Sequence, residues 1–368
     1  RFIMKTKKIG FVGLGLIGGS IAKAIRQYYP DYELLAFDKN KETLALAVQE
    51  EIIHTVSSSI DDNFRDCDYI FLCAPISFNN AYLSQLKDYI SPNCILTDVG
   101  SVKTSIHEEI IRLGLEENFI GGHPMAGSEK SGFVNSKAIL IENAYYILTP
   151  SANVAREKVE AYKAFVSSLK ALPIELDYHQ HDMLTGTISH LPHIIASNLV
   201  NFVKETDTDD ELMKMLAAGG FKDITRIASS SPIMWQQICL KNKEPISKIL
   251  GGFIDSLSET KKLIDQSSER ELYCMFESSR DYRNSMPNSS AGPIKRQFLL
   301  YCDIVDEAGG IATIATILAT NHISIKNIGI IHNREFEEGV LLIEFYDQDS
   351  SVQAAELLKK YHYIVYEV

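Results

Sequence analysis

The sequence predicts an α/β protein in three parts: a doubly wound parallel sheet, an all-helical domain and a small βαββαβ domain. Three observations lead to this prediction. A glycine-rich turn joins a strand-like run to a helical pattern near the start, long stretches of helical period fill the middle, and six short elements close the chain. A length of 368 residues with 45% hydrophobic content suits two or three domains of about 100 to 200 residues each.

The first part is expected to cover residues 1–172. An apolar run at residues 8–12 is closed by Gly13, and a helical pattern follows over residues 17–28. Further strand-like runs, separated by amphipathic helical stretches, lie at residues 34–37, 69–74, 94–99 and 145–149. Strands that alternate with helices in this way favour a parallel, doubly wound sheet of the Rossmann type.

The second and third parts are expected at residues 173–290 and 296–368. Helical periodicity with hardly any strand signal runs over residues 177–286, which predicts an all-helical domain. The turn formers of residues 287–293 are typical of a linker. Beyond them the patterns alternate as strand, helix, strand, strand, helix, strand, the order of a ferredoxin-like βαββαβ module.

Composition and charge exclude several classes of function. The formal net charge is −12 and we find no basic patch, so neither nucleic acid nor an anionic membrane surface is an expected partner. The six cysteines are scattered without a CxxC pair, as suits a reducing compartment. No apolar run approaches membrane-spanning length and the start of the chain lacks a signal-peptide pattern, so we expect a cytoplasmic protein.

A GxGxxG motif joins the first predicted strand to the first helix, and it consists of Gly13, Leu14, Gly15, Leu16, Ile17 and Gly18. Its glycines allow a tight turn and let a pyrophosphate approach the helix N-terminus, where unpaired N–H groups bind anions. Asp38 follows the second strand, where a carboxylate can accept hydrogen bonds from an adenosine ribose and would repel a 2′-phosphate. The motif and Asp38 predict NAD rather than NADP, although Lys39 leaves some use of NADP open. The alternative to a nucleotide site is a tight βα turn in another α/β fold.

His123 lies in the segment GGHPMAGSEKSG at residues 121–132, which predicts a sharply turning loop after the apolar run 118–120. Loops at the carboxyl ends of Rossmann strands face the cofactor crevice. Since the ordinary pKa of a histidine is about 6.5, a neutral imidazole can accept a hydroxyl proton near pH 7 while a nicotinamide takes the hydride. His123 is therefore the candidate general base; the alternative, from the loop alone, is a histidine that caps a turn.

Five sequence blocks together resemble the prephenate dehydrogenase family of tyrosine biosynthesis. They occur in the family's order over about residues 8–290 and read GLGLIGGS (13–20), DVGSVK (98–103), GGHPMAGSEKSG (121–132), SHLPH (189–193) and GGFKDITRIASSSPIMW (219–235). The resemblance implies NAD-dependent oxidative decarboxylation of prephenate to 4-hydroxyphenylpyruvate and CO2. Aromatisation supplies the driving force of such a reaction, so the protein needs to orient the ring, stabilise the nascent ketone and hold a dianion.

The resemblance also implies roles for single residues. His123 matches the histidine that contacts the ring hydroxyl, Ser101 matches a serine near that hydroxyl and the nicotinamide, and Arg226 matches the arginine that binds a substrate carboxylate. Asp223 lies three residues before Arg226, so on a helix it can orient the guanidinium. The remaining substrate-site matches are His181, His193, Lys222, which can come from the partner subunit, and Glu129, which resembles a residue at the pocket mouth. The alternative for Asp223 and Arg226 is an ordinary surface ion pair. For His181 and His193 it is a structural role, and for Lys222 and Glu129 it is that of solvated charges.

Four histidines crowd one region of the sequence, at positions 179, 181, 190 and 193. Pro192 interrupts any simple helical phase, so their spacing does not place them on one face, and neither cysteine nor an HExxH motif accompanies them. We therefore expect no metal site, and hydride transfer to NAD needs none.

The C-terminal module resembles the ACT domain, a small amino-acid-sensing module, and this resemblance suggests tyrosine as a feedback inhibitor. The candidate effector residues are Asp306, Gly309, Asn321 and Ile323. Ala308 stands where such domains usually carry proline, which weakens the expected rigidity of the turn. A purely structural or dimerising module is the alternative.

Two other functions stay open at this point. An arogenate dehydrogenase would act on a substrate with an amino group where prephenate has a keto group. A non-catalytic amino-acid sensor would be expected to lack His123 or Arg226, and both are present. β-Hydroxyacid dehydrogenases share the domain order but normally rely on a catalytic lysine, and the segment 121–132 is foreign to them.

The helical part carries more apolar surface than one copy can bury. In a single copy, the stretches 194–203 and 246–263 would expose apolar surface to water. The sequence therefore predicts a homodimer through residues 177–286.

Overall fold

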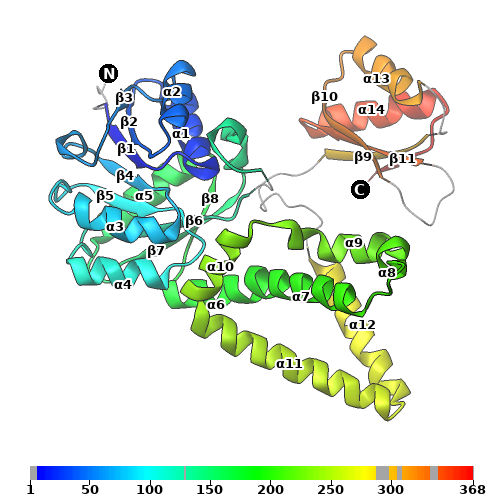
Figure 1. Ribbon diagram of the computed structural model, residues 1–368. Coiled ribbons are helices and arrows are strands. Elements are labelled where there is room, and N and C mark those ends of the chain that lie inside the picture. The colour runs from blue at the N-terminus through cyan, green and yellow to red at the C-terminus, as the bar shows by residue number, and fades with distance from the viewer. Residues whose placement is uncertain (1–5, 128–129, 287–297, 305–308, 332–338, 368) are drawn as a thin grey trace. The chain divides into compact units, whose positions relative to one another are not determined.

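The computed structural model describes residues 6–127, 130–286, 298–304, 309–331 and 339–367 (Figure 1). The chain divides into two compact units, Arg1–Gly292 and Pro293–Val368. No helix in the described ranges is long and apolar enough to cross a membrane.

A five-stranded parallel sheet forms the centre of the first unit, in the order β3-β2-β1-β4-β5. Its strands are β1 (Lys8–Val12), β2 (Glu33–Phe37), β3 (Thr55–Val56), β4 (Tyr69–Leu72) and β5 (Ile95–Asp98). Ile9 aligns with Leu34 of β2 on one side and with Tyr69 of β4 on the other. This is the order of the first five strands of a doubly wound Rossmann sheet, which confirms the predicted fold class.

Helices cover both faces of this sheet, because consecutive strand residues point to opposite faces. Ile9 and Phe11 pack among the helices of one face and Val12 among those of the other. The first layer contains α1 (Leu16–Tyr28), α2 (Lys41–Gln49) and α5 (Arg156–Ser168). The second layer contains α3 (Ile76–Leu86) and α4 (Thr104–Leu113), with the short 3₁₀ turn η1 (Asp62–Phe64).

Three further strands extend this unit, in the order β6-β7-β8: β6 (Ile120–Pro124), β7 (Tyr145–Pro150) and β8 (Leu172–Glu175). β6 and β7 are antiparallel, whereas a parallel arrangement was expected. The reason is the connection between them, which has only the short turns η2 (Phe133–Asn135) and η3 (Ala138–Leu140) in its described part. A parallel pair needs a longer crossover, usually a helix.

The remainder of the first unit is helical, as predicted. It comprises α6 (Tyr178–Thr185), the π-helical turn η4 (Gly186–His190), α7 (Leu191–Thr206), α8 (Leu212–Leu216), α9 (Gly219–Thr225), the 3₁₀ turn η5 (Arg226–Ser229), α10 (Pro232–Lys241), α11 (Lys243–Asp265) and α12 (Glu269–Ser285). Asp177 caps α6 by accepting hydrogen bonds from the N–H groups of His179 and Gln180. Pro192 lies in the first turn of α7, where a missing N–H costs little, so the chain stays helical through it.

The second unit has the predicted βαββαβ order. Its elements are β9 (Phe298–Ile304), α13 (Gly310–Thr320), β10 (Ile325–Ile331), β11 (Gly339–Phe345), α14 (Gln348–Lys360) and β12 (Val365–Glu367). The strands form an antiparallel sheet in the order β10-β11-β9-β12. Alternate residues of β9, among them Leu300 and Cys302, are buried against Ile314 of α13 and Leu358 of α14. The two helices therefore cover one face of the sheet.

The candidate effector residues of this unit lie around α13. Gly309 precedes the helix with φ +97°, a left-handed conformation that favours glycine. Asn321 follows the helix, and its side-chain amide donates to the carbonyl of Ile317 (2.8 Å). The side chain of Ile323 is buried in the core of the unit, which leaves only its backbone for a ligand. Asp306 lies outside the described residues, as does Ala308.

Candidate active site

The GxGxxG motif forms the predicted turn between β1 and α1. Gly13 has φ +94°, and a Cβ there would lie 2.7 Å from the backbone nitrogen of Ala74, so no other residue fits without displacement. A Cβ at Gly18 would lie 2.8 Å from Cβ of Cys73. Gly15, in contrast, faces open space and is the N-cap of α1, whose first turn carries no acidic side chain. The helix therefore presents unpaired N–H groups to a space that can hold a pyrophosphate.

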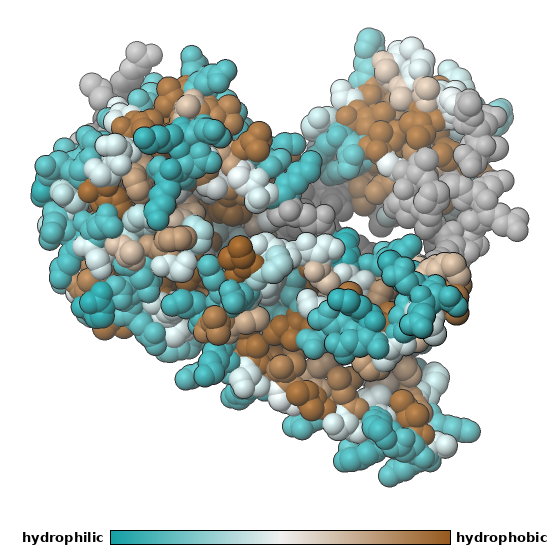
Figure 2. Space-filling model, in the orientation of Figure 1, coloured by the Kyte–Doolittle hydropathy of each residue, from teal (hydrophilic) through white to brown (hydrophobic). Residues whose placement is uncertain are grey.

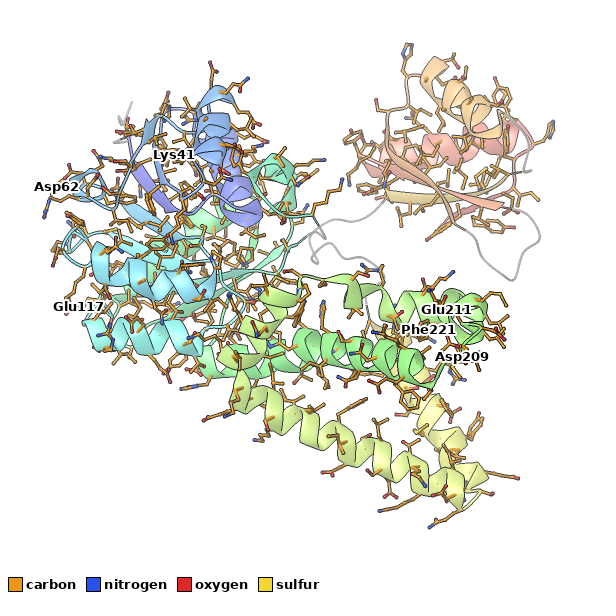
Figure 3. The ribbon with its side chains drawn as sticks, viewed as in Figure 1. Lys41, Asp62, Glu117, Asp209, Glu211 and Phe221 are labelled. Carbon is orange, nitrogen blue, oxygen red and sulfur yellow. The ribbon has the colours of Figure 1, made fainter. Side chains whose placement is uncertain are left out.

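Asp38 lies directly after β2, at the edge of this space. Its carboxylate accepts hydrogen bonds from the N–H groups of Leu14 (2.7 Å) and Asn40 (2.8 Å), which orient it while leaving lone pairs for a ribose diol. It lines two cavities, of about 200 and about 820 Å³. Lys41, which begins α2, lines the larger one (Figure 3). The ammonium of Lys39 lies 4.3 Å from the ring centre of Phe78. These residues fit an NAD cofactor.

His123 lies near the end of β6 and not in a loop, which corrects the expectation from its glycine-rich surroundings. It pairs with Ile147 of β7. The glycines have a packing role: a Cβ at Gly122 would lie 2.5 Å from the carbonyl oxygen of Asp98, and one at Gly121 would lie 2.3 Å from Oγ1 of Thr149. They therefore let β6 approach the end of β5 closely, and the histidine that follows them is brought to the carboxyl edge of the parallel sheet.

A buried ion pair holds the backbone just before His123. The ammonium of Lys103 is hydrogen-bonded to the carboxylate of Asp98 and donates to the carbonyl of Gly122 (2.7 Å). The same carboxylate accepts from the N–H of Gly122 (3.1 Å). Burial lowers the pKa of Lys103, and the adjacent Asp98 opposes that shift. Both backbone groups of Gly122 are thus fixed by a single pair of opposite charges.

His123 and His181 face each other across the two parts of the first unit. Nδ1 of His123 lies 2.8 Å from Nε2 of His181, which comes from α6. Burial, together with the neighbouring His181, holds the pKa of His123 well below its usual value. Burial also lowers the pKa of His181. Both rings are therefore neutral near pH 7, the state in which His123 can accept a proton.

We expect the acid limb of the pH profile of kcat/KM to lie below about pH 6.5, the ordinary pKa of a histidine. A base with a lowered pKa stays unprotonated, and active, until the pH falls through that lowered value. Steady-state rates in overlapping buffers would measure this limb. A limb at or above pH 6.5 would contradict the neutral, buried base.

His193 and Arg226 form a second group, on α7 and η5. Nδ1–H of His193 donates to the carbonyl of Ser189 (2.9 Å), so Nε2 carries the lone pair. Its ring stacks on Trp235, with ring centres 3.8 Å apart. Burial lowers the pKa of His193, and the positive charge of Arg226 adds to that shift.

The other predicted residues are placed as follows. Ser101 follows β5 and is half-buried. Lys222 and Asp223 are exposed on α9. α9 ends at Thr225 and Arg226 begins the 3₁₀ turn η5, so Asp223 and Arg226 belong to two consecutive helical elements. Glu129 lies outside the described residues.

Five residues that the sequence analysis did not assign to the substrate site lie in the hydrogen-bonded networks around it: Asp98, Lys103, Asp182, His190 and Asn242. The side-chain amide of Asn242 donates to the carbonyl of Asp182 (3.0 Å) and to Nδ1 of His190 (3.0 Å). Burial lowers the pKa of His190 to about 4. Two signals were available: Asp98 and Lys103 are the first and last residues of the block DVGSVK, and Asp182 directly follows His181. Among the described residues, no group of three or more His, Cys, Asp or Glu side chains is arranged to hold a metal ion.

Two family models match the first unit. "Prephenate dehydrogenase, nucleotide-binding domain" matches residues 21–175, and "Prephenate dehydrogenase, dimerization domain" matches residues 177–278. A prephenate dehydrogenase of Bacillus subtilis (strain 168) is 36% identical over 349 residues, which are 94% of each chain. An alignment of that length extends into the second unit.

Solved structures of similar proteins agree with these matches. The crystal structure of prephenate dehydrogenase from A. aeolicus in complex with hydroxyphenyl propionate and NAD+ has a TM-score of 0.73 and 32% identity, and the match covers 77% of this chain and 100% of that one. Synechocystis arogenate dehydrogenase has a TM-score of 0.69 and 29% identity, covering 75% of this chain and 99% of that one. With the nucleotide turn, the paired histidines and the helical domain in place, this chain belongs to the prephenate dehydrogenase family.

Proposed function

We propose that this chain converts prephenate to 4-hydroxyphenylpyruvate and CO2. It is an NAD-dependent oxidoreductase of its family, and NAD, when bound, accepts the hydride from the ring carbon that bears the hydroxyl. The observation that carries the proposal is His123, a neutral imidazole at the carboxyl edge of the nucleotide-binding sheet, hydrogen-bonded to His181 of the helical part. A base where the nucleotide-binding sheet meets the helical part of the first unit is suited to a substrate held between them.

The described residues divide the work of the reaction. Neutral His123 accepts the proton of the ring hydroxyl as the carbonyl forms. The planar guanidinium of Arg226 binds a carboxylate of the substrate, and His193 contributes to the same site. Ser101, just beyond β5, lies at the same sheet edge and contributes a hydroxyl near the reacting carbon. Lys222, Asp223 and Glu129 are proposed as further substrate-binding residues, as the family resemblance implies.

Absorbance of the reduced cofactor, followed with NAD and either prephenate or arogenate, tests this assignment. We expect turnover with prephenate and a much lower kcat/KM with arogenate. Arogenate is included because the chain is similar to the Synechocystis arogenate dehydrogenase. The reverse preference would assign the chain to arogenate oxidation. Absence of turnover with both would overturn the proposed function.

We also propose a homodimer through residues 177–286. The helices there expose large apolar side chains, among them Phe202 (63% exposed), Leu216 (72%), Leu257 (54%) and Phe276 (66%). Figure 2 shows apolar surface over α7 and α11. A cavity of about 550 Å³ lies between the end of α7 and α8–α9 and is lined by apolar residues such as Met213 and Phe221 (Figure 3). A second copy would bury these surfaces, and a monomer in sedimentation velocity would refute the assembly.

The second unit is proposed to be an ACT-like module through which tyrosine inhibits the enzyme. Its support is the βαββαβ order and the left-handed glycine before α13. We expect tyrosine to inhibit the full-length chain and not a chain ending at residue 290, which keeps the first compact unit. Initial rates during a tyrosine titration would measure this. Unchanged inhibition of the shorter chain would show that tyrosine acts at the catalytic site.

A further inference from the structure

Asp182, His181 and His123 form a continuous hydrogen-bonded row. Oδ1 of Asp182 lies 2.8 Å from Nδ1 of His181, and Nε2 of His181 lies 2.8 Å from Nδ1 of His123. Asp182 and His181 are fully buried, and His123 is partly buried. The far nitrogen of His123, Nε2, takes no part in the row.

Asp182 is held as a carboxylate. Besides His181 it accepts hydrogen bonds from the N–H of Lys103 (2.8 Å) on Oδ1 and from the N–H of Thr104 (2.8 Å) on Oδ2. Burial opposes its charge, but these donors together hold the pKa of Asp182 below its usual value. An ionised carboxylate only accepts hydrogen bonds, so every neighbour in contact with it must donate.

The positions of the protons along the row then follow from valence. Nδ1 of His181 donates to Asp182, so in the neutral ring Nε2 of His181 carries the lone pair and accepts. Nδ1 of His123 must therefore carry a hydrogen and donate, which leaves the lone pair of His123 on Nε2. The opposite tautomer would present an N–H from Nε2, which cannot accept a hydroxyl proton.

We propose that Asp182 is a positioning residue, which acts through His181 to keep the proton of His123 on Nδ1 so that Nε2 is the base that receives the substrate's hydroxyl proton. This inference rests on the proposed function and adds a residue and a nitrogen to it. The logic is that of the serine-protease triad, in which an aspartate fixes the tautomer of the catalytic histidine; here a second histidine stands between them.

The same carboxylate also joins the two parts of the first unit. Thr104 begins α4, and the preceding residue, Lys103, provides no side-chain cap, so Asp182 of α6 supplies the missing acceptor at the helix N-terminus. The segment between β5 and α4, which contains Ser101, and the histidine pair are thus attached to one side chain. Movement of α6 relative to this segment would therefore disturb both the orientation of His123 and the cap at the N-terminus of α4.

The tautomers can be observed directly, without substrate. Two-bond ¹H–¹⁵N correlation spectra of protein labelled with ¹⁵N-histidine distinguish a ring nitrogen that bears a proton from one that does not. Spectra of the His123→Asn and His181→Asn variants would assign the two rings among the ten histidines of the chain. We expect both rings to carry their proton on Nδ1 at neutral pH. A proton on Nε2 of His123 would overturn the proposal.

Kinetics of Asp182 variants supply the second test. Asp182→Ala should lower kcat by about 10²-fold or more, because a base without a fixed tautomer loses much of the 10²- to 10⁴-fold that general-base catalysis provides. KM should change far less. In Asp182→Asn, which conserves volume, the amide can present either its oxygen or its NH₂ to His181. The fraction of kcat that this variant retains should therefore follow the fraction of His123 with its proton on Nδ1.

Asp177→Ala is the matched control. The carboxylate that it removes caps the same helix, α6, through the N–H groups of His179 and Gln180, and the backbone hydrogen bond from His181 to the carbonyl of residue 177 is kept. We expect a lower Tm with unchanged kcat and an unchanged His123 tautomer. If Asp177→Ala lowers kcat as much as Asp182→Ala does, Asp182 only stabilises the helix and the proposal fails. A protein in which both histidines carry their proton on Nδ1 but which turns over neither prephenate nor arogenate would contradict the proposed function. The proposed proton positions of Asp182, His181 and His123 would still stand.

Discussion

The His123→Asn variant is expected to turn over about 10²- to 10⁴-fold more slowly than the natural chain, with little change in substrate binding. An amide lacks a basic nitrogen, so proton removal from the ring hydroxyl loses its general base, whereas Arg226 and the nucleotide turn are untouched. Because the pKa of His123 is held well below its usual value, the base is fully active near pH 7 and the loss should be complete there. Steady-state kcat and KM at neutral pH would measure it.

A neighbouring histidine provides the control for this substitution. His179 lies two residues before His181 on α6, is exposed, and packs its ring against that of Tyr178. His179→Asn should leave kcat unchanged. Near-normal turnover in His123→Asn would remove His123 from its role as base, whatever the effect on stability.

The Lys103→Met variant is expected to lose about 3 to 5 kcal/mol of the free energy of unfolding, and with it the catalytic geometry. Lys103 is fully buried and its partner Asp98 almost so, and removal of one member leaves the other charge buried without compensation. Gly122 would lose a hydrogen bond from its carbonyl, and His123, the next residue, would lose its fixed backbone. Urea denaturation followed by circular dichroism would measure the change in stability.

Lys158→Met is the matched control for this change. The ammonium of Lys158 also donates to two backbone carbonyls, those of Pro92 (2.6 Å) and Glu117 (2.9 Å), but at the surface and without a buried carboxylate. Lys158→Met should lower the free energy of unfolding far less than Lys103→Met does. The double variant Asp98→Asn/Lys103→Met should recover part of the stability, since it removes the isolated charge. Equal losses in Lys103→Met and Lys158→Met would show that the buried pair has no special role.

Much of the fold could be predicted because its signals are local. The glycines around Gly13 mark a βα turn, Asp38 marks the end of the next strand, and helical period without strand signals marks residues 177–286. The strand pairing of β6 was not predicted. GGH looks like a loop because glycines usually interrupt strands, but here Gly121 and Gly122 are the residues that permit a strand to approach Asp98 and Thr149.

Part of the candidate site could be proposed from the sequence. His123 and Arg226 could be proposed from the blocks that contain them, and His181 from the wider resemblance, because a family resemblance preserves the chemistry of single positions. The partners of these residues could not be recognised. Asp182 meets the N–H groups of Lys103 and Thr104 across 79 and 78 positions of the chain, and a buried carboxylate looks the same in the sequence as a solvated one.

The sequence by itself determined most of the secondary structure, the nucleotide turn and the candidate reactive side chains, because each depends on residues that are neighbours along the chain or on a motif that contains them. Only the tertiary structure decided which nitrogen of His123 is free, and which charges hold the strand that carries it. Hydrogen bonds are directional and burial excludes water, so the state of an imidazole is set by the atoms that surround it in space.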